Sequence, residues 1–257
     1  MRGIKGFAER LLLKLLYRRR ANGSSAELFE TRIWGGPLRG MRLSVIARER
    51  ISYALGSYEK HLLRTMQKHV TPGMVAYDIG ANCGYFSLIL SELVGPRGKV
   101  FAFEADSRNL AALKANMERN GIDNVEVVGK AVSQHTGQVR FASFGYSLVG
   151  HIVEQDGVSN GSVRTVDAIS LSDFVAEDAG RAPGFIKIDV EGAEEAVFAG
   201  AREVLAKYRP VVAAEIRQSA WHPISDWMKG NGYSIGCLDG GWQMERHGLT
   251  DAIFLPA

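Results

Sequence analysis

The sequence predicts an α/β fold, a mostly parallel sheet with helices on both faces, and three observations support this prediction. Between residues 74 and 128, short apolar runs alternate with stretches of helical composition. The runs are apolar throughout, which is typical of parallel strands that helices cover on both sides. Four such runs along the chain end in a carboxylate, namely Asp78, Glu104, Asp189 and Glu215.

The composition is that of an ordinary globular protein. The chain has 257 residues, of which 46% are hydrophobic and 23% charged, and its formal net charge is +3. This excludes collagen-like and disordered chains, and so small a charge does not by itself argue for a nucleic-acid partner. Two cysteines cannot form a disulfide framework, so we expect a reducing, cytoplasmic location. No run of about 18 apolar residues is present, so we expect no membrane span.

Residues 1–25 are expected to form a basic amphipathic helix followed by a polar break. Residues 1–20 hold seven basic side chains against one acid, and their apolar residues are spaced as on one helix face. Lys14 interrupts the apolar stretch, unlike the core of a secretory signal. Two interpretations remain open. The segment packs on the protein's own surface or frays, or it lies on an anionic membrane and places the protein peripherally at the inner membrane face.

Residues 26–70 are predicted to form a hairpin and a helix that extend the main domain. Apolar runs at 27–34 and 41–46 flank a turn that contains glycine and proline, a pattern typical of paired strands. A helix is expected over 58–69, because the sequence Thr71-Pro72-Gly73 ends the helical pattern.

Residues 71–257 are predicted to form one domain in which strands and helices alternate. Ser107 is expected to cap the second helix, and Gly121 to end it in a left-handed conformation. Residues 143–161 are interpreted as a long loop, a kind of segment that is commonly a functional lid or disordered. In chain order, the expected strands are 74–77, 99–103, 125–128, 139–144, 163–166, 185–188, 211–214, 233–238 and 252–255, and the expected helices are 85–93, 107–120, 193–208 and 225–230.

The four strand-end carboxylates are expected to meet at one edge of the sheet. In an open parallel sheet, ligands bind in the crevice outside the carboxyl ends of the strands. A buried carboxylate without a partner is unfavourable, so four acids at this edge indicate polar or charged partners there.

The turn after the first of these strands is typical of nucleotide-binding sites. It reads Asp78-Ile79-Gly80-Ala81-Asn82-Cys83-Gly84, and its glycines permit close approach of a ligand and tight packing of the next helix. Glu104, twenty residues after Gly84, stands where an acid accepts hydrogen bonds from ribose hydroxyls. The alternative is an ordinary tight turn with an acid at the surface.

These residues also discriminate between classes of nucleotide ligand. A phosphate-binding loop is excluded because no lysine followed by serine or threonine comes after the glycines, and the dinucleotide motif lacks its third glycine. Asp78 would repel a pyrophosphate but would attract an α-ammonium group. A ligand with adenosine at one end and an amino acid at the other fits better, and that ligand is S-adenosylmethionine.

Two sequence blocks resemble the FkbM family of methyltransferases. The first combines VAYDIGANCGYFS (75–87) with FAFEAD (101–106) and NVEVVGKAVS (124–133), and the second is FIKIDVEGAE (185–194). The resemblance covers roughly residues 55–216. It implies the class I methyltransferase Rossmann-like fold, with a seven-stranded sheet in the order 3-2-1-4-5-7-6 whose last strand is antiparallel. It also implies S-adenosylmethionine-dependent methylation of hydroxyl oxygens, mostly on sugars or polyketides.

The resemblance further implies roles for individual residues. The turn 78–84 would hold the methionine part of the cofactor and Glu104 the ribose hydroxyls. Ala105, Asn124, Val125 and residues 130–132 would lie on the adenine side. Cys83 is interpreted as a small buried packing residue. The expected cofactor-binding residues are Asp78, Gly80, Ala81, Asn82, Gly84, Tyr85, Phe86, Glu104, Ala105, Asn124, Val125 and Ala131.

The second block supplies candidates for the chemistry. Lys187 and Asp189 are two residues apart on one strand and therefore point to the same side. Three interpretations are open: Asp189 orients or deprotonates the acceptor hydroxyl; Asp189, Glu191 and Glu215 bind a divalent cation; or Glu191 and Glu194 only stabilise the start of a helix. The third is preferred for Glu194, and no metal is assigned. The candidate catalytic residues are Asp189, Lys187, Glu191, Glu215 and His222.

His222 is a candidate base because a sugar hydroxyl is a poor nucleophile, and a group that titrates near neutral pH would help to deprotonate it. His151, in the expected long loop, is a weaker candidate. Trp221 and Trp242 could stack on sugar rings, although core packing is the preferred interpretation for both.

The sequence thus predicts an S-adenosylmethionine-dependent O-methyltransferase acting on a sugar, a glycan or a related small natural product, with no nucleic-acid partner. A nucleic-acid methyltransferase is disfavoured because residues 188–191 lack an Asn/Asp-Pro-Pro-aromatic motif. A non-catalytic scaffold that binds the cofactor and an NAD-dependent oxidoreductase remain as alternatives. If the N-terminal helix contacts a membrane, a lipid-linked glycan or another envelope saccharide is the expected acceptor.

Overall fold

The computed structural model describes residues 18–20, 28–45, 51–143, 150–152, 162–238, 244–246 and 248–257. Most of the expected N-terminal helix, most of the expected loop 143–161, the link 239–241 and Trp242 lie outside the described residues. Within the described ranges, none of the helices combines the length and the apolar character needed to cross a bilayer.

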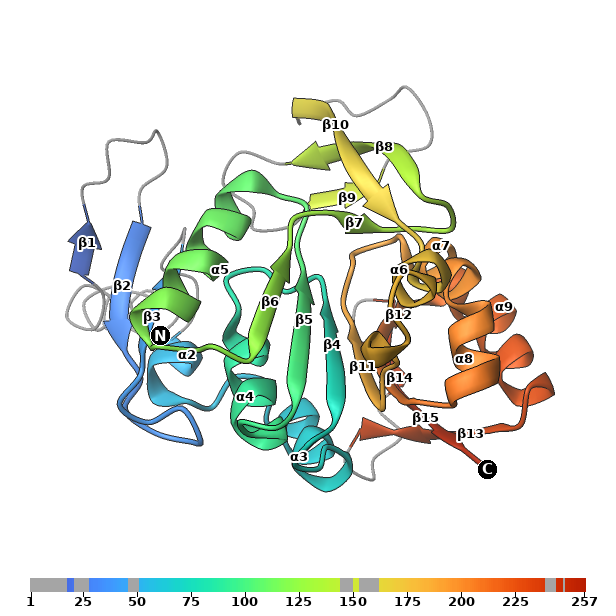
Figure 1. Cartoon of the computed structure of the whole chain (residues 1–257), viewed down its shortest axis with the longest axis horizontal. Coiled ribbons are helices and arrows are strands. Elements are labelled where there is room, and N and C mark those ends of the chain that lie inside the picture. The colour runs from blue at the N-terminus through green and yellow to red at the C-terminus, as the bar shows by residue number, and fades with distance from the viewer. Residues whose placement is uncertain are drawn as a thin grey trace, which may run out of the picture.

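The main sheet has the order β6-β5-β4-β11-β12-β15-β13, and β14 (Met244–Arg246) adds to β15 (Figure 1). Strands β6 to β12 of this series are parallel to one another, whereas β15 is antiparallel to β12 and β13. This order confirms the predicted α/β class and the 3-2-1-4-5-7-6 arrangement. The strands are β4 (Val75–Ile79), β5 (Lys99–Phe103), β6 (Val125–Val128), β11 (Phe185–Ile188), β12 (Val211–Arg217), β13 (Tyr233–Cys237) and β15 (Leu249–Pro256).

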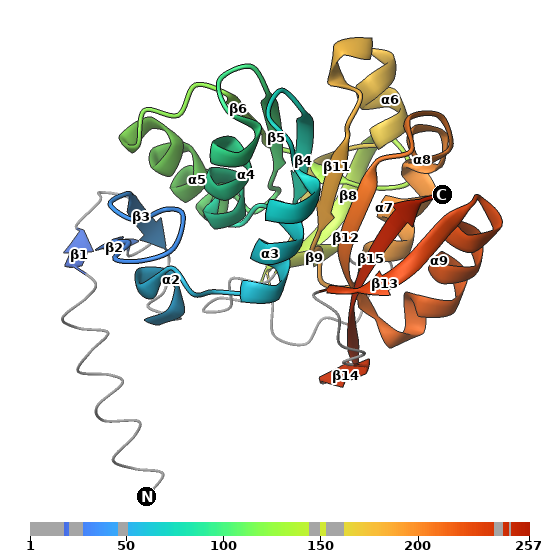
Figure 2. The same cartoon turned by 90° about the horizontal axis from the view of Figure 1, so that it is seen from below.

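Helices cover both faces of the main sheet (Figure 2). Alternate strand residues enter two separate cores: Ala76 and Ala102 face the first core, and Tyr77 and Phe103 face the second. Both faces of these strands are therefore buried, which explains why their apolar runs are unbroken. The first face carries α3 (Lys60–His69), α4 (Tyr85–Val94) and α5 (Ser107–Arg119), and the second carries α6 (Leu171–Ala176), α7 (Glu194–Gly200), α8 (Arg202–Tyr208) and α9 (Gln218–Gly230).

The N-terminal part forms a small antiparallel sheet rather than only a hairpin. β2 (Leu28–Arg32) pairs with β3 (Arg42–Val45), which confirms the predicted strand pair. β1 (Arg18–Arg20) adds to β2, so the expectation of helix is wrong for these three residues. The sequence analysis also missed the short helix α2 (Ile51–Leu55).

Asn116, on α5, joins this small sheet to the main domain. Its side chain is fully buried. Its Oδ1 accepts a hydrogen bond from the backbone N–H of Ser44 at 2.7 Å, and its Nδ2 donates to the carbonyls of Ser44 and Cys83, each at 2.8 Å. One amide therefore ties β3 and α5 to the glycine-rich turn after β4.

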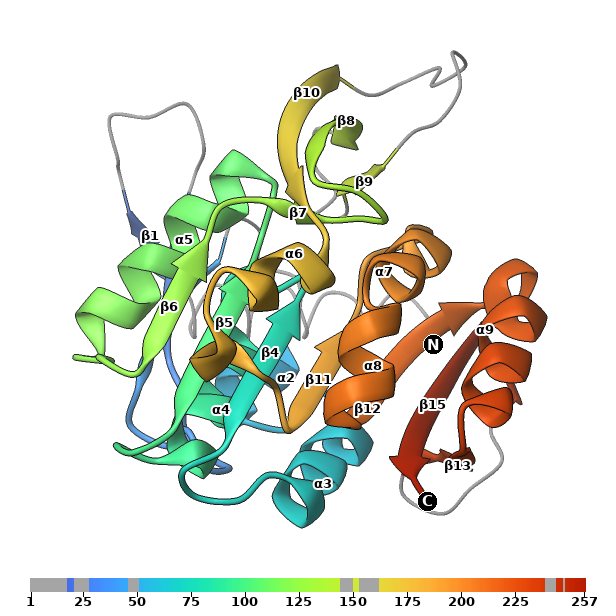
Figure 3. The ribbon, with the colours of Figure 1, turned by 45° about the vertical axis from the view of Figure 1, so that its right-hand side comes forward.

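A second sheet with the order β7-β10-β8-β9 lies beyond the carboxyl ends of β4 and β5 (Figure 3). It consists of β7 (Ala131–Val132), β8 (Gly137–Ser143), β9 (Gly150–Ile152) and β10 (Ser162–Ile169). The strands predicted at 139–144 and 163–166 are confirmed as β8 and β10. β9, which pairs with β8, falls inside the segment expected to be a loop, and its three residues are too few to show a strand pattern in the sequence.

Three helix boundaries differ from the expectations. The helix expected over 193–208 is broken at Ala201 into α7 and α8. Gly200 lies so close to the main chain of Ser133 that a Cβ on Gly200 would be 2.1 Å from the Ser133 carbonyl oxygen.

The cap of α5 is Asp106 rather than Ser107, because the Asp106 carboxylate accepts from the backbone N–H groups of residues 108 and 109. α9 begins seven residues before the predicted start, and α6 was not predicted.

Candidate active site

The glycine-rich turn lies at the carboxyl edge of the main sheet, against the end of β11. Gly80 has a φ of 74°, and a Cβ on this residue would lie 1.8 Å from the carbonyl oxygen of Asp189. A Cβ on Gly84 would lie 2.4 Å from Cδ1 of Leu113 on α5. The contact with Asp189, rather than a ligand, is the immediate reason for glycine at position 80, and helix packing is the reason at position 84. The two sequence blocks are therefore in contact through their main chains, at Gly80 and Asp189.

Glu104, at the end of β5, is buried and linked to the same turn. Its Oε2 accepts from the N–H of Asn82, and its Oε1 accepts from the N–H of Asp106, both at 2.7 Å. Burial raises the pKa of Glu104 to about 7, although the two N–H groups oppose this shift. Each carboxylate oxygen has more than one acceptor position, so the group retains capacity for further hydrogen bonds.

Asp78 is bound by groups of the protein itself. Its carboxylate is fully buried, and its Oδ2 accepts a hydrogen bond from the hydroxyl of Ser87 at 2.6 Å. Its Oδ1 forms an ion pair with Nζ of Lys187 at 3.1 Å. From the sequence, Asp78 was expected to attract the α-ammonium group of a ligand. The internal lysine already compensates this charge, so that reasoning is corrected.

Lys187 is the cation at the centre of the site, with only 3% of its side chain exposed. Besides Asp78, it contacts the carbonyl of Gly80 at 3.0 Å and Oδ2 of Asp189 at 3.6 Å. Burial disfavours its charge, but the carboxylates of Asp78 and Asp189 outweigh burial and raise the pKa of Lys187 above its ordinary value. Lys187 therefore stays protonated and holds the turn, β4 and β11 together.

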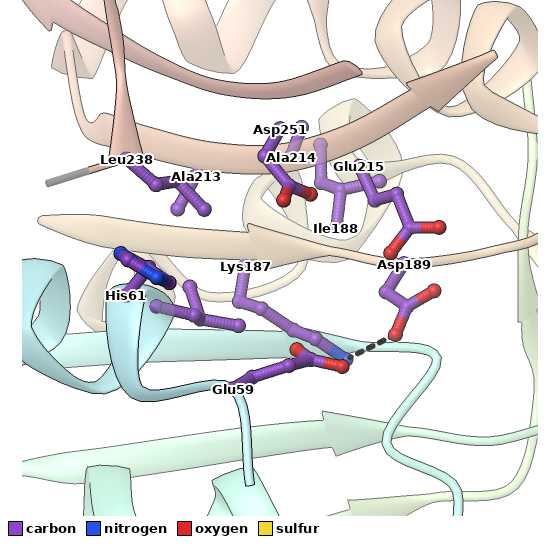
Figure 4. A pocket seen from close by; sticks show the side chains of 11 residues that line it. Glu59, His61, Lys187, Ile188, Asp189, Ala213, Ala214, Glu215, Leu238 and Asp251 are labelled. Carbon is purple, nitrogen blue, oxygen red and sulfur yellow. Dashed lines mark ion pairs between the residues drawn. The ribbon is translucent and has the colours of Figure 1, made fainter. Parts of the chain in front are cut away.

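A cavity of about 60 Å³ lies between the start of α3 and strands β11, β12 and β15 (Figure 4). Lys187 and Asp189 face it from β11 and the residue after that strand, Glu215 from β12 and Asp251 from β15. Glu59, immediately before α3, faces the same space from the other side. The remaining lining residues are His61, Leu62, Ile188, Ala213, Ala214 and Leu238.

Several carboxylates around this cavity bind protons more tightly than usual. Burial, followed by the charge of Asp189, raises the pKa of Glu215 to about 8. Burial is also the main cause that raises the pKa values of Glu59 and Asp251, with the charge of Asp189 adding to both. Glu59 has a φ of 42° and a ψ of 59°, a left-handed conformation that is uncommon for a residue with a side chain. Such conformations cluster at functional sites.

The turn after β11 is held by contacts within the protein. Nη2 of Arg217 donates to the carbonyl of Glu191 at 3.0 Å and lies 3.5 Å from its Oε2. Glu194 is buried, and its Oε1 accepts from the N–H of Gly192 at 2.6 Å. Burial raises the pKa of Glu191. The contact of Glu194 at the start of α7 agrees with the structural role preferred for it.

The structure does not bring every expected cofactor residue to the carboxyl edge. Asn124 and Val125 stand at the start of β6, which is the opposite edge of the sheet, and this corrects their assignment to the adenine side. The amide of Asn124 contacts Ser91 and the carbonyl of Gly95, so it joins α4 to β6. Ala131 follows the end of β6 and begins β7, on the correct edge.

Tyr85 and Phe86 are buried at the start of α4, where their rings contact each other and Tyr58. The carbonyl of Ala105 accepts a hydrogen bond from Arg164 of β10 at 3.4 Å. Cys83 is buried, and burial raises its pKa to about 12, as expected for a packing residue.

His222 is not part of the cavity. It is exposed on α9, whereas the lining residues come from α3, β11, β12, β15 and the segment after β13. Trp221, beside it, packs against the second core, in agreement with the preferred interpretation. His151 lies in β9, whose side chains are outside the description.

Three residues that line the cavity were not predicted from the sequence, namely Glu59, His61 and Asp251. The signal for Asp251 was present, since it precedes an apolar strand expected beside the strand that carries Glu215. Glu59 and His61 gave no signal, because their place depends on how α3 packs on the sheet. The described residues include no group of three or more His, Cys, Asp or Glu side chains arranged to hold a metal ion.

Comparison with known proteins gives matches over this region. The model of the methyltransferase FkbM domain matches residues 78–235. The chain is 30% identical over 152 residues to the 2-O-methyltransferase NoeI of Sinorhizobium fredii, covering 54% of this chain and 61% of NoeI. It is 27% identical over 194 residues to the 31-O-demethyl-FK506 methyltransferase FkbM of Streptomyces tacrolimicus, covering 64% of this chain and 74% of that protein.

Among solved structures, methyltransferase FkbM from Methylobacillus flagellatus KT matches with a TM-score of 0.50 and 22% identity, over 70% of this chain and 43% of that chain. A putative rRNA methylase from Clostridium thermocellum matches with a TM-score of 0.50 and 10% identity, over 76% of this chain and 93% of that chain. At these identities the two structures support the fold. This chain thus spans less than two thirds of NoeI and less than half of the solved Methylobacillus FkbM chain.

Proposed function

The chain belongs to the FkbM family of methyltransferases, and on that premise we propose that it transfers the methyl group of S-adenosylmethionine to a hydroxyl oxygen of a sugar, a glycan or a related small natural product. The observation that carries the proposal is the junction of the two sequence blocks at Gly80 and Asp189, which places the glycine turn beside a cavity lined by carboxylates. The names of the relatives support the oxygen as the methylated atom, since one is a 2-O-methyltransferase and another acts on 31-O-demethyl-FK506.

The residues at the carboxyl edge fit S-adenosylmethionine. Glu104 is a buried carboxylate with unused acceptor capacity, as ribose hydroxyls require. The turn at 80–84 offers backbone groups for the methionine part, and Ala105 and Ala131 border the adenine side. The cofactor supplies a methyl group on a positively charged sulfur, which an acceptor oxygen can attack. Tyr85 and Phe86 would contribute apolar walls rather than polar contacts.

The reacting hydroxyl of the acceptor would enter the cavity that Lys187, Asp189 and Glu215 line, and it would point toward the turn. Most of the rate would come from alignment of that hydroxyl and from exclusion of water. Asp189 would orient the hydroxyl, since its position is fixed by Lys187. Glu191, which Arg217 holds, would keep the turn after β11 in place.

The finer parts of this proposal concern partners and location. The acceptor would be a small molecule or a saccharide and not a nucleic acid, and the protein would act in the cytoplasm. The basic segment 1–20 would provide peripheral contact with an anionic membrane. Binding to vesicles of neutral and of anionic lipid, compared for the full chain and for a chain that lacks residues 1–17, measures this contact directly.

The experiment that tests the function starts with calorimetric titration by S-adenosylhomocysteine. We expect micromolar affinity for the wild type, loss of binding in Glu104→Ala, and no change in Glu126→Ala, where the acid is exposed on β6. Thermal unfolding of each variant shows whether it is folded. Transfer of an isotope-labelled methyl group to a panel of saccharides then identifies the acceptor. Absence of cofactor binding by folded wild type would contradict the proposal, whereas binding without transfer to any acceptor would favour the scaffold alternative.

A further inference from the structure

Three neighbouring strands bring three carboxylates to one side of the cavity. β11 and β12 pair in parallel with Ile188 opposite Ala214, so Asp189 and Glu215 follow as the next positions on the two strands. β12 and β15 pair with Glu215 directly opposite Asp251. Glu215 is therefore the central member of the row, between two acids (Figure 4). Like charges placed directly opposite each other across a strand pair destabilise a sheet, so this arrangement requires an explanation.

Asp189 shares one cation with Asp78, whereas Glu215 has no cation beside it among the described residues. Lys187 lies 3.6 Å from Asp189 and 3.1 Å from Asp78, and both contacts are made by the same buried ammonium group. Arg217, the next cation along β12, pairs with Glu191 instead. Within the described part of the chain, no cation lies within 4 Å of Glu215.

The acids that face Glu215 from the surrounding elements favour its protonated form. Glu59 comes from the residue before α3 and Asp251 from β15. His61 of α3 and Lys187 of β11 line the same cavity, and their positive charges act in the opposite sense. From the end of β11 and the turn after it come Asp189 and Glu191, whose charges also act on Glu215. Burial and these acids raise the pKa of Glu215 to about 8. A carboxylate with a pKa near the working pH is well suited to accept a proton, since catalytic efficiency depends on this match.

We propose that Glu215 is the catalytic residue that takes the proton of the acceptor hydroxyl, with Asp251 and Glu59 as positioning residues whose negative charges favour the binding of that proton. This inference rests on the proposed function and refines it, because the site otherwise offers Asp189, whose position between Lys187 and the turn suits orientation. His61 is the competing base at the cavity, and His222 lies outside it.

The O–H bond of the acceptor breaks, and its proton goes to a carboxylate oxygen of Glu215. The acceptor oxygen forms a bond to the methyl carbon, the bond between that carbon and sulfur breaks, and its electron pair remains on sulfur. Glu215 then returns its proton to water after the product leaves.

The first test needs no acceptor. In protein labelled with ¹³C at glutamate side-chain carboxyls, we expect one signal to titrate near pH 8, with and without S-adenosylhomocysteine. This signal should be missing in Glu215→Gln. In Asp251→Asn its titration midpoint should move to lower pH, because a neighbouring negative charge is removed. Assignment by Glu215→Gln separates it from Glu104 and Glu59, whose pKa values are also raised. Titration of the Glu215 signal below about pH 6 would overturn the proposal.

The second test uses the acceptor that the saccharide panel identifies. Glu215→Gln should lower kcat by about 10²-fold to 10⁴-fold and remove the rise of kcat toward pH 8, while the affinity for S-adenosylhomocysteine stays within about twofold. Asp251→Asn should move that rise to lower pH. Glu203→Gln, an exposed acid on α8, serves as the matched control. A kcat for Glu215→Gln within threefold of wild type, or loss of the pH-dependent rise in His61→Gln instead, would overturn the proposal.

These readouts separate the two proposals. If wild type fails to bind S-adenosylhomocysteine, the proposed function fails whatever Glu215 does. If wild type binds S-adenosylhomocysteine and transfers methyl groups, but Glu215→Gln shows the same pH dependence as wild type, only the assignment of Glu215 fails.

Discussion

Gly80 and Asp189 are in direct main-chain contact, and the distance of 1.8 Å from a Cβ on residue 80 to the Asp189 carbonyl oxygen leaves no room for any side chain. Two segments more than a hundred residues apart are thereby fixed relative to each other. One carries the expected cofactor turn and the other begins the cavity.

Gly80→Ala should therefore be more harmful than an ordinary glycine substitution. Gly121 has a similar φ of 63°, but a Cβ there meets nothing within 4 Å. We expect Gly121→Ala to lower the free energy of unfolding by about 1–2 kcal/mol, the cost of a left-handed residue. Gly80→Ala should add a steric term of about 1–3 kcal/mol and weaken binding of S-adenosylhomocysteine. Urea unfolding and calorimetry measure both effects, and equal losses in the two variants would contradict the steric role.

Lys187→Met should destabilise the protein strongly, because it leaves the fully buried Asp78 without its cation. Loss of one partner of a buried ion pair costs about 3–5 kcal/mol. The double variant Lys187→Met/Asp78→Asn should recover part of this loss, since it also removes the uncompensated charge. Lys114→Met, an exposed lysine on α5, is the control and should change the free energy of unfolding by less than about 0.5 kcal/mol. No recovery in the double variant would refute the pairing.

Asn116→Ala should lower the free energy of unfolding by about 2–4 kcal/mol, since buried backbone groups of Ser44 and Cys83 lose their partners. Asn120 offers a matched control on the same helix. It makes an equivalent pair of bonds to the backbone of Arg42, but these bonds are exposed to water. Asn120→Ala should cost less than about 1 kcal/mol. Equal losses measured by urea unfolding would show that burial of the Asn116 amide is unimportant.

The stability of the protein should fall as the pH rises from about 5 to about 8. The pKa of Glu215 is raised to about 8 and that of Glu104 to about 7, against an ordinary value of 4.5. Between about pH 5 and pH 8 the folded protein therefore binds more protons than the unfolded chain, and the loss of these protons favours unfolding. Urea unfolding at several pH values measures the slope. Glu215→Gln should make it shallower, most clearly between pH 7 and pH 8, and an unchanged slope would contradict the raised pKa of Glu215.

Much of the fold could be predicted from the sequence. The strands at 99–103, 125–128 and 185–188 have the predicted limits, because each is an apolar run that polar or turn-forming residues interrupt on both sides. The helix α2 and the strand β9 were missed because elements of five and three residues are too short to show a clear period in the sequence. The cap at Asp106 was assigned one residue late, since an Asp-Ser sequence offers two capping residues.

The candidate site was predictable only where it is built from strand ends. Asp189 and Glu215 come together because parallel strands end at one edge, which the sequence pattern already indicates. Asn124 comes before its strand, and residues before a parallel strand lie at the edge of the sheet opposite the candidate site. The sequence pattern was therefore enough to avoid this misassignment. The internal pairing of Asp78 with Lys187 was not predictable, because it depends on the register between β4 and β11.

The cavity takes part of its lining from outside the region that matches the family model. The family match covers residues 78–235, yet Glu59 precedes this region and Asp251 follows it. Under the proposed function, changes in these two short flanking segments would alter the acceptor site without touching the cofactor turn or Lys187.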